Sequence, residues 1–360
     1  MSKNKNISKF FLGANTPGGF FSRFDNLYTP DEDWFCYIIK GGPGTGKSGL
    51  MKKVAKAAKD KDIKTQLIYC SSDPDSLDAV IFPDKRVCIA DGTSPHSIDP
   101  IYPGASDTVI NLSDCWDSGK LYDSRENIIN LTKKNSNYHL RSRLYLQAYG
   151  NIYKDTLKMI KDGVNKDKVK NYSKRLSKKF FKRKQDIFGK EKIYFISGIT
   201  PDGIVIFEDT INNYHHVYTI DDEYGIVSSI ILQDIRYDAI KYGYDIITCF
   251  CPLDPKNKVE CILIPDLDLA FAVSNSLHPL SGVRYEKKIN SLRFLDNKKL
   301  KENKQKIRFN KKILNELLKE SINNLARAKS VHDKLEEEYI KCMDFKKVDK
   351  VADDIINKIF

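Results

Sequence analysis

Apolar runs and amphipathic stretches alternate along the first part of this chain of 360 residues. Residues 34–40 (WFCYIIK) form an apolar run that predicts a buried strand, and residues 49–61 (GLMKKVAKAAKDK) carry the pattern of a helix. Residues 86–91 (RVCIAD) predict a further strand. Strands that alternate with helices favour an α/β fold with a mostly parallel sheet, which binds ligands at the carboxyl ends of its strands. We therefore expect the ligand-binding and catalytic residues to lie where these apolar runs end.

The segment between the first predicted strand and the helix is rich in glycine. It consists of Gly41, Gly42, Pro43, Gly44, Thr45, Gly46, Lys47 and Ser48, and Gly49 follows in the helix. The segment fits the pattern GxxxxGK[ST], and the strand and the helix are the flanks that this pattern requires. Glycines let the backbone curl with positive φ, and the helix start presents free N–H groups and the positive end of the helix dipole. The segment therefore predicts a loop that binds a chain of phosphates.

Four side chains become candidates for the chemistry of this loop. Lys47 is expected to reach the β- and γ-phosphates, and the hydroxyl of Ser48 is expected to bind Mg²⁺. Asp91 ends a neighbouring apolar strand and is the candidate for the second Mg²⁺ contact; the alternative is an ordinary turn residue. Asp73 also ends a predicted strand, where an aspartate orients an attacking water or closes a turn. The candidate catalytic residues are thus Lys47, Asp91 and Asp73, and the candidate metal ligands are Ser48 and Asp91.

The chain contains an internal repeat. Residues 10–20 (FFLGANTPGGF) reappear as residues 194–204 (YFISGITPDGI), at an offset of 200 − 16 = 184. The segment YCSSDP at 69–74 matches FCPLDP at 250–255, and residues 110–117 loosely follow residues 289–296. Because the order of elements is the same in both halves, we interpret the chain as a tandem duplication with a joint near residues 186–191.

Each half is predicted to have a sheet followed by a helical segment. The first domain covers residues 1–188, with a core at 8–120 and a helical segment at 121–188. The second covers residues 189–360, with a core at 191–296 and a helical segment at 297–360. Leu, Tyr and Ile recur at helical spacing in both closing segments, which indicates helical hairpins packed on the sheets or on each other. The predicted fold is α/β, with two tandem P-loop NTPase-like parallel-sheet domains, each followed by a helical hairpin segment.

The second half serves as an internal control for the first. At an offset of 181 the glycine-rich loop falls on residues 222–229 (DEYGIVSS), where Ser228 takes the place of the lysine. Asp222 and Glu223 then lie where phosphate would bind, and carboxylates repel phosphate. We therefore expect the second half to be an inactive copy. Asp73 and His96 recur in that half as Asp254 and His278, and this recurrence favours structural roles for both.

Taken together, these motifs resemble an uncharacterised bacterial family of duplicated P-loop ATPases, found mainly in Gram-positive bacteria. The resemblance rests on FFLGANTPGGF, IIKGGPGTGKSGLMKK, YCSSDPDSLDAVIFP and CIADGTSPHSIDP in the first half, and on ISGITPDG and CPLDP in the second. It implies a P-loop NTPase fold in each half, ATP as the ligand, and phosphate binding by the loop at residues 41–48. It implies no particular substrate.

Composition and charge add few constraints. Hydrophobic residues make up 41% and charged residues 30% of the chain, as is typical of a soluble globular protein. The first 13 residues hold only a short apolar run, so we expect neither a signal peptide nor a membrane span. We therefore expect the protein to be cytoplasmic. The net charge of +12 fits either solvated helix faces or a protein or nucleic-acid partner bound through basic helices. Oligomeric state is not predictable from the sequence.

Three functions follow from these features. The leading hypothesis is a Mg²⁺-dependent ATPase, with an arginine from the second half, Arg236, Arg284 or Arg293, completing its site. The alternative is a nucleotide or small-molecule kinase, in which Arg141 and Arg143 belong to a lid that excludes water. A second alternative is a non-catalytic scaffold or nucleic-acid-binding module that depends on ATP.

Overall fold

The computed structural model describes residues 6–184 and 187–360. The strands of the first half are β1 (Ile7–Phe11), β2 (Gly13–Thr16), β3 (Gly19–Ser22), β4 (Phe35–Lys40), β5 (Thr65–Tyr69), β6 (Leu77–Phe82), β7 (Val87–Asp91) and β8 (Asp107–Asn111). Its helices are α1 (Lys47–Asp60), α2 (Ser118–Asp123), α3 (Arg125–Lys161) and α4 (Lys166–Phe180).

The second half begins with β9 and ends in a helix. Its strands are β9 (Glu191–Tyr194), β10 (Ser197–Thr200), β11 (Gly203–Ile206), β12 (His216–Asp221), β13 (Ile246–Cys251), β14 (Asp254–Ile264), β15 (Leu269–Ser274) and β16 (Lys287–Asn290). Its helices are α5 (Glu208–Ile211), α6 (Ile226–Lys241), α7 (Asn297–Glu302), α8 (Lys304–Ile340) and α9 (Phe345–Ile359).

Within the described residues, each half contains one six-stranded sheet. The first sheet has the order β1-β5-β6-β7-β4-β8, and the second has the order β9-β13-β14-β15-β12-β16. All pairs are parallel except those of β6 and β14, which are antiparallel to both of their neighbours. The α/β class is therefore confirmed. Each sheet is mostly parallel, as expected, but mixed, because no crossover helix lies between β5 and β6 or between β6 and β7. The identical strand order agrees with the sequence repeat.

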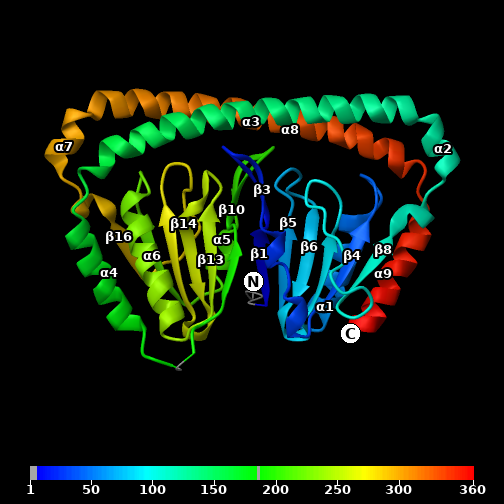
Figure 1. Ribbon diagram of the computed structural model, residues 1–360, viewed down its shortest axis with the longest axis horizontal. Coiled ribbons are helices and arrows are strands. Elements are labelled where there is room, and N and C mark those ends of the chain that lie inside the picture. Colours follow the sequence, from blue (N-terminus) through cyan, green and yellow to red (C-terminus); the bar gives the residue numbers. More distant parts are fainter. Residues whose placement is uncertain (1–5, 185–186) are drawn as a thin grey trace.

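The two sheets meet in the middle of the molecule (Figure 1), where Phe11 at the end of β1 pairs with Phe195, which directly follows β9. Phe11 and Phe195 exchange two backbone hydrogen bonds of 2.9 Å each. One continuous apolar core surrounds this contact and includes Phe10 and Leu12 from one half and Tyr194 from the other. Because this core belongs to both sheets, each half covers apolar surface of the other.

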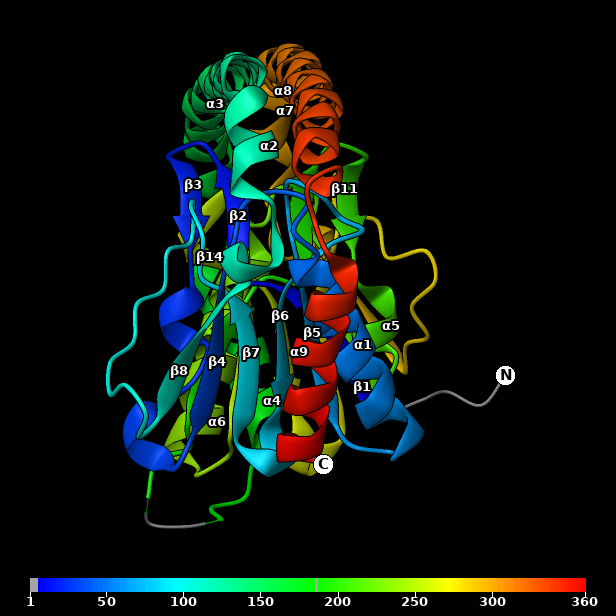
Figure 2. The same ribbon diagram turned by 90° about the vertical axis from the view of Figure 1, so that its right-hand side faces the viewer.

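Two long helices, α3 and α8, lie side by side across one end of both sheets (Figures 1 and 2). Each has 37 residues, which corresponds to a length of about 55 Å. The hydroxyls of Ser142 and Ser321 form a buried hydrogen bond of 2.8 Å between the two helices. The carboxyl end of β4 faces the last turns of α8, so this pair covers the edge of the sheets where ligands were expected.

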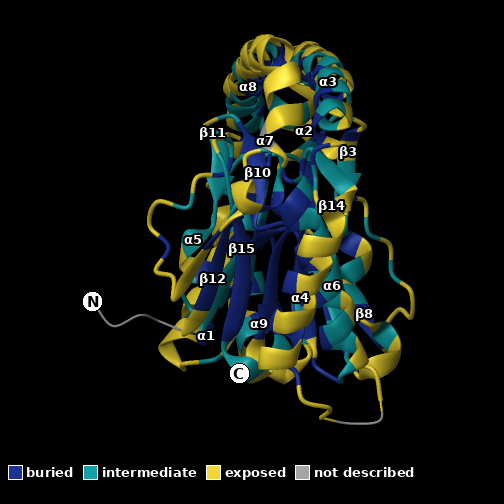
Figure 3. Ribbon diagram, turned by 90° about the vertical axis from the view of Figure 1, so that its left-hand side faces the viewer, coloured by how far each residue is buried: buried dark blue, intermediate teal, exposed yellow. Residues whose placement is uncertain are grey.

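The last helices of the two halves are exchanged. Helix α4 belongs to the first half but packs on the second sheet, where Leu176 lies in one core with Ile231 (Figure 3). Helix α9 closes the second half but packs on the first sheet, where Ile355 lies in one core with Val54. The expected helical segments are therefore present. The long helices pack on each other, and each closing helix packs on the sheet of the opposite half. The boundary between residues 188 and 189 stays a prediction, and residue 186, where the expected joint begins, lies outside the described residues.

None of the helices within residues 6–184 and 187–360 combines the length and the apolar composition that crossing a bilayer requires.

Candidate functional site

The glycine-rich loop joins the end of β4 to the start of α1, as the sequence predicts. Gly44 and Gly46 have positive φ values of 67° and 89°, which L side chains rarely adopt. The hydroxyl of Thr45 donates a hydrogen bond of 2.8 Å to the carbonyl of Gly42 and holds the curl. The loop therefore has the strand, the turn and the helix start that were expected of it.

Lys47 lies across this loop. Its Nζ donates to the carbonyl of Gly41 at 3.0 Å and to that of Gly42 at 2.6 Å. The same Nζ lies 3.6 Å from Oδ2 of Asp91, and both side chains are largely buried. The structure therefore brings together the lysine and the carboxylate that the sequence singled out separately.

Asp91 is positioned by the sheet, because β7 is the direct neighbour of β4 and Asp91 pairs with Ile39. Its Oδ1 accepts hydrogen bonds from the backbone N–H of Thr93 at 2.9 Å and from the Thr93 hydroxyl at 2.5 Å. One oxygen thus closes a turn while the other faces Lys47. Asp91 therefore fits both interpretations from the sequence, since one carboxylate oxygen belongs to a turn and the other faces the loop lysine.

Ser48 and Asp73 lie near each other at the start of β6. The hydroxyl oxygen of Ser48 accepts a hydrogen bond of 3.0 Å from the N–H of Leu77. The Ser76 hydroxyl donates to Asp73 at 2.6 Å, which is the turn contact expected from its recurrence in the second half. The other oxygen of Asp73 lies 3.5 Å from Nζ of Lys329 on α8. Asp73 is therefore both a turn residue and a charged group at the edge of the loop.

Helix α8 supplies further side chains that the sequence analysis missed. The N–H of Gly44 donates a hydrogen bond of 3.2 Å to Oε1 of Glu336. A Cβ on Gly42 would lie 2.5 Å from the ring of Tyr339, so this glycine is needed for the approach of α8. His332, 3.5 Å from Glu336, holds the pKa of that carboxyl below its ordinary value, although burial acts in the opposite direction. Glu336 is thus an anion bound at a loop N–H.

The expected arginines take other positions. Arg236 forms two hydrogen bonds of 2.6 Å with Glu191. Arg293 lies over the ring of Tyr172 at 4.6 Å, and the backbone N–H of Arg284 donates to the side chain of Asn212. These three contacts lie around the second sheet, and the cation that the structure brings to Asp73 is Lys329.

A buried histidine and a carboxylate form the same pair in both halves. Nε2 of His96 lies 3.5 Å from Asp78, and Nε2 of His278 lies 3.6 Å from Glu260. The ring of His96 also stacks on Phe24 with centroids 4.5 Å apart. Because the pair persists where the glycine-rich loop has been lost, its geometry supports a structural role.

His96 predicts a pH-dependent stability. Burial acts to lower its pKa, but the charge of Asp78, the hydrogen bond to Asp78 and the charge of Asp91 together outweigh burial, so the pKa is raised. A histidine with a raised folded pKa stabilises the fold fully below its unfolded pKa of about 6.5, and this stability is lost as pH rises through the folded pKa. We expect the free energy of urea unfolding of the wild type, relative to His96→Gln, to fall between about pH 6 and pH 8. The exposed His215→Gln is the control, and a difference that stays level or grows contradicts the assignment.

The corresponding loop of the second half is two residues shorter. Gly225 precedes α6 with a φ of 74°, as Gly46 precedes α1 with a φ of 89°. Ile226 therefore corresponds to Lys47, and the expected match of Lys47 to Ser228 is wrong, because an alignment without gaps overlooks the deletion. The N–H of Ser228 donates instead to Oδ2 of Asp222 at 2.7 Å. A carboxylate of the chain itself thus binds the start of this helix.

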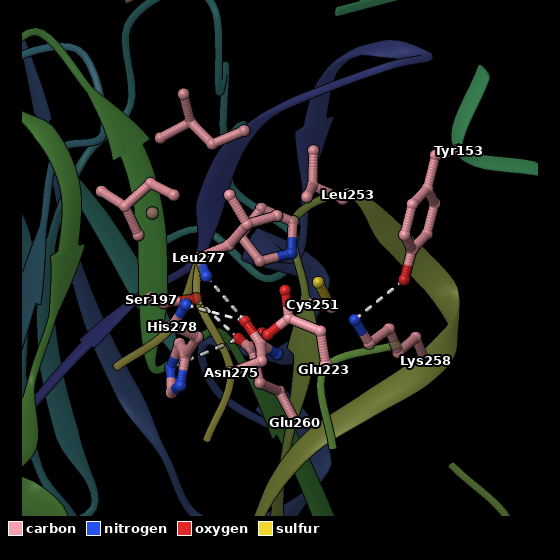
Figure 4. A pocket seen from close by; sticks show the side chains of 14 residues that line it. Tyr153, Ser197, Glu223, Cys251, Leu253, Lys258, Glu260, Asn275, Leu277 and His278 are labelled. Carbon is pink, nitrogen blue, oxygen red and sulfur yellow. Dashed lines mark hydrogen bonds and ion pairs between the residues drawn. The ribbon is translucent and has the colours of Figure 1, made fainter. Parts of the chain in front are cut away.

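Side chains of the second half, together with Tyr153 of α3, enclose a small cavity beside this shorter loop (Figure 4). Nζ of Lys258 donates to the hydroxyl of Tyr153 at 3.1 Å, and a Cβ on Gly225 would lie 2.7 Å from that Nζ. Glu223 accepts from the N–H of Ser276 at 3.0 Å and pairs with Lys311 at 2.5 Å. The space beside the loop is therefore filled by charged groups that already have partners. Val273 occupies the place of Asp91 in the strand register, because it pairs with Ile220 as Asp91 pairs with Ile39.

The first-half site fits Mg²⁺ and a nucleoside triphosphate. The N–H of Gly44 already binds the carboxylate of Glu336, and Lys47 is held by neutral carbonyls that phosphate oxygens would replace. The hydroxyl of Ser48 and the carboxylate of Asp91 are the oxygen ligands that a hard cation prefers. Within the described residues, no group of three or more His, Cys, Asp or Glu side chains is placed to hold a metal ion. The Ser48 and Asp91 pair is of a different kind, since phosphate oxygens and water must complete the coordination.

Comparisons of the chain with protein-family models, curated proteins and solved structures gave no match.

Proposed function

We propose that the chain is a Mg²⁺-dependent P-loop NTPase that binds one ATP, at the loop of its first half. The observation that carries this proposal is the convergence of Lys47 and Asp91 at 3.6 Å, in a loop that precedes a helix. In the second half, Ile226 and Val273 take these two places. The family membership, the preference for ATP and the cytoplasmic location expected from the sequence belong to the same proposal.

The reaction that this site supports best is hydrolysis of the terminal phosphate. Lys47 exchanges the carbonyls of Gly41 and Gly42 for phosphate oxygens and neutralises charge there. The hydroxyl of Ser48 and Oδ2 of Asp91, the oxygen that faces Lys47, would hold Mg²⁺, which would neutralise phosphate charge. Asp73, in the loop before β6, is the carboxylate that we propose to orient the attacking water.

The kinase alternative lacks a corresponding observation. A Cβ on Gly19, in the hairpin of β2 and β3, would lie 3.3 Å from Cδ of Arg143. That hairpin is a different part of the molecule from the glycine-rich loop. An arginine in this position packs on the hairpin instead of covering the loop. Hydrolysis is therefore the reading that the geometry favours.

Asp91→Asn provides the test of this proposal. We expect ATP to bind the wild type more tightly with Mg²⁺ than without it, and the variant to lose most of this difference, since an amide is a weaker Mg²⁺ ligand than a carboxylate. Calorimetry at a series of Mg²⁺ concentrations measures the effect. Asp99→Asn is the matched control, because Asp99 is an exposed aspartate paired with Lys40.

Two results would contradict the proposal: no ATP binding by the wild type, or equal Mg²⁺ dependence in both variants. The products formed from ATP then identify the reaction. Phosphate released from ATP alone supports an ATPase, whereas ADP formed only with an added nucleoside, nucleotide or sugar supports a kinase.

A further inference from the structure

Helix α8 carries charged or titratable side chains where it passes the first-half loop, and α3 carries a glycine, a leucine, an isoleucine and a tyrosine at the equivalent positions. The two helices begin at Lys304 and Arg125 and have equal lengths, so equivalent residues differ by 304 − 125 = 179. The equivalent pairs are Lys329 and Gly150, His332 and Tyr153, Glu336 and Leu157, and Tyr339 and Ile160. The charged groups of α8 therefore lie beside the loop that contains Lys47, and the other loop has no counterparts of them on α3. This difference points to a role at the first-half loop.

Lys329 is the cation of this group. Its Nζ lies 3.5 Å from Asp73 and also pairs with Asp333 one turn along the helix. The side chain is 26% exposed, so the ammonium is partly withdrawn from water yet still reachable. Asp73 lies in the loop that connects β5 to β6, and the first N–H of β6 donates to the hydroxyl of Ser48. Lys329 thus approaches the loop from the side of the expected Mg²⁺ ligand.

Glu336 marks the other end of the contact between α8 and the loop. It accepts from the Gly44 N–H, a group that phosphate would use in a loop of this type. Lys329 and Glu336 are seven residues apart, which places them two turns, or about 10.5 Å, apart on one face of α8. A polyphosphate that displaces Glu336 from Gly44 therefore extends toward Lys329.

We propose that Lys329 is a further phosphate-binding residue, which contacts the terminal phosphate of the bound nucleotide. This inference rests on the function proposed above. Without nucleotide, Asp73 and Asp333 hold the ammonium in place, and Glu336 occupies the loop N–H. When phosphates bind, Glu336 leaves Gly44 and Lys329 turns from Asp73 to the terminal phosphate. Lys329 would thus take the role that the sequence analysis proposed for an arginine of the second half.

Equilibrium binding of ATP and ADP to the full chain tests this proposal. Lys329→Ala is expected to lower the affinity for ATP by about tenfold or more, the worth of one charge-assisted contact, and to leave the affinity for ADP within about twofold. Lys329→Gln keeps most of the side chain if the alanine variant folds poorly, and Lys329→Arg should restore part of the ATP affinity. Lys334→Ala, an exposed lysine of the same helix, should change neither affinity.

Glu336→Gln adds an effect of the opposite sign. A neutral amide competes less for the Gly44 N–H, so ATP and ADP should both bind several-fold more tightly, while the exposed Glu337→Gln should have no effect. A merely structural pair between Lys329 and Asp73 predicts a lower melting temperature and equal losses for ATP and ADP, and that result overturns the proposal. No nucleotide binding by the wild type overturns the proposed function itself, whereas normal selectivity for ATP in Lys329→Ala overturns this inference alone.

Discussion

Replacing Lys47 with alanine is expected to weaken ATP binding by about 10- to 100-fold, because charge-assisted hydrogen bonds contribute about 1.5–3 kcal/mol. The lysine is held by two loop carbonyls and lies 3.6 Å from Asp91, so no other cation of α1 is equally placed. Removing it should leave the loop conformation intact, since the turn depends on Gly44, Gly46 and Thr45. Isothermal calorimetry with ATP and Mg²⁺ measures the loss.

Lys52→Ala is the matched control, because Lys52 is an exposed lysine in the next turn of the same helix. It removes the same charge without touching the loop, and the affinity should stay within about twofold of the wild type. If Lys47→Ala and Lys52→Ala reduce the affinity equally, nucleotide is attracted only by the general positive charge of the chain. The loop would then have no specific role.

A second large effect follows from the exchanged helices. Ile355 on α9 is 3% exposed and lies in the core of the first sheet, and Leu176 on α4 is 5% exposed and lies in the core of the second. Ile355→Ala and Leu176→Ala should each cost about 2–5 kcal/mol, as is usual for buried large side chains. Because the helices are exchanged, each loss should appear mainly in the half to which the residue does not belong in sequence.

Hydrogen exchange of the backbone amides measures where this stability is lost. Ile355→Ala should raise exchange in β4 and α1, and Leu176→Ala should raise it in α6 and β12. The two variants control each other, since they remove similar apolar groups from equivalent helices. Faster exchange in α6 after Ile355→Ala, with α1 unchanged, would show that each closing helix stays on its own sheet.

The exchange gives the second half a role that needs no nucleotide of its own. Its helix α8 places Glu336 and Lys329 at the first-half loop, and its helix α9 places Phe345 and Val348 against Gly46. The second half therefore contributes side chains around the first-half loop, while Asp222 and Lys258 lie against its own loop. Under the proposed function, this arrangement gives a physical role to a half that binds no nucleotide.

The sequence predicted the local features of the site well. A glycine loop between an apolar strand and a helix has a specific pattern, and the parallel neighbour of β4 brings Asp91 to Lys47. Strand β6 was missed because Leu77–Phe82 is buried at every position and shows no alternation. The second loop was aligned two residues out, because a deletion leaves no mark in an offset taken from the flanking strand.

The long-range features were beyond the sequence pattern. An amphipathic stretch shows that a helix packs, but its periodicity does not name the sheet on which α4 or α9 packs. Glu336 lies 292 residues along the chain from Gly44, and Lys329 is similarly remote from Asp73. Lysines and glutamates are also common on that helix. A comparison of α3 with α8, position by position, carries the one signal that marks them, since Gly150 and Leu157 stand at the equivalent places.

The central claim is that one chain binds one nucleotide, in its first half. Photo-crosslinking of an azido-ATP analogue, combined with the binding stoichiometry and peptide mapping, tests it most directly. We expect one nucleotide per chain, with the label confined to peptides of the loop at residues 41–48 and of α8. Two nucleotides per chain, or a label on residues 222–228, would contradict the account.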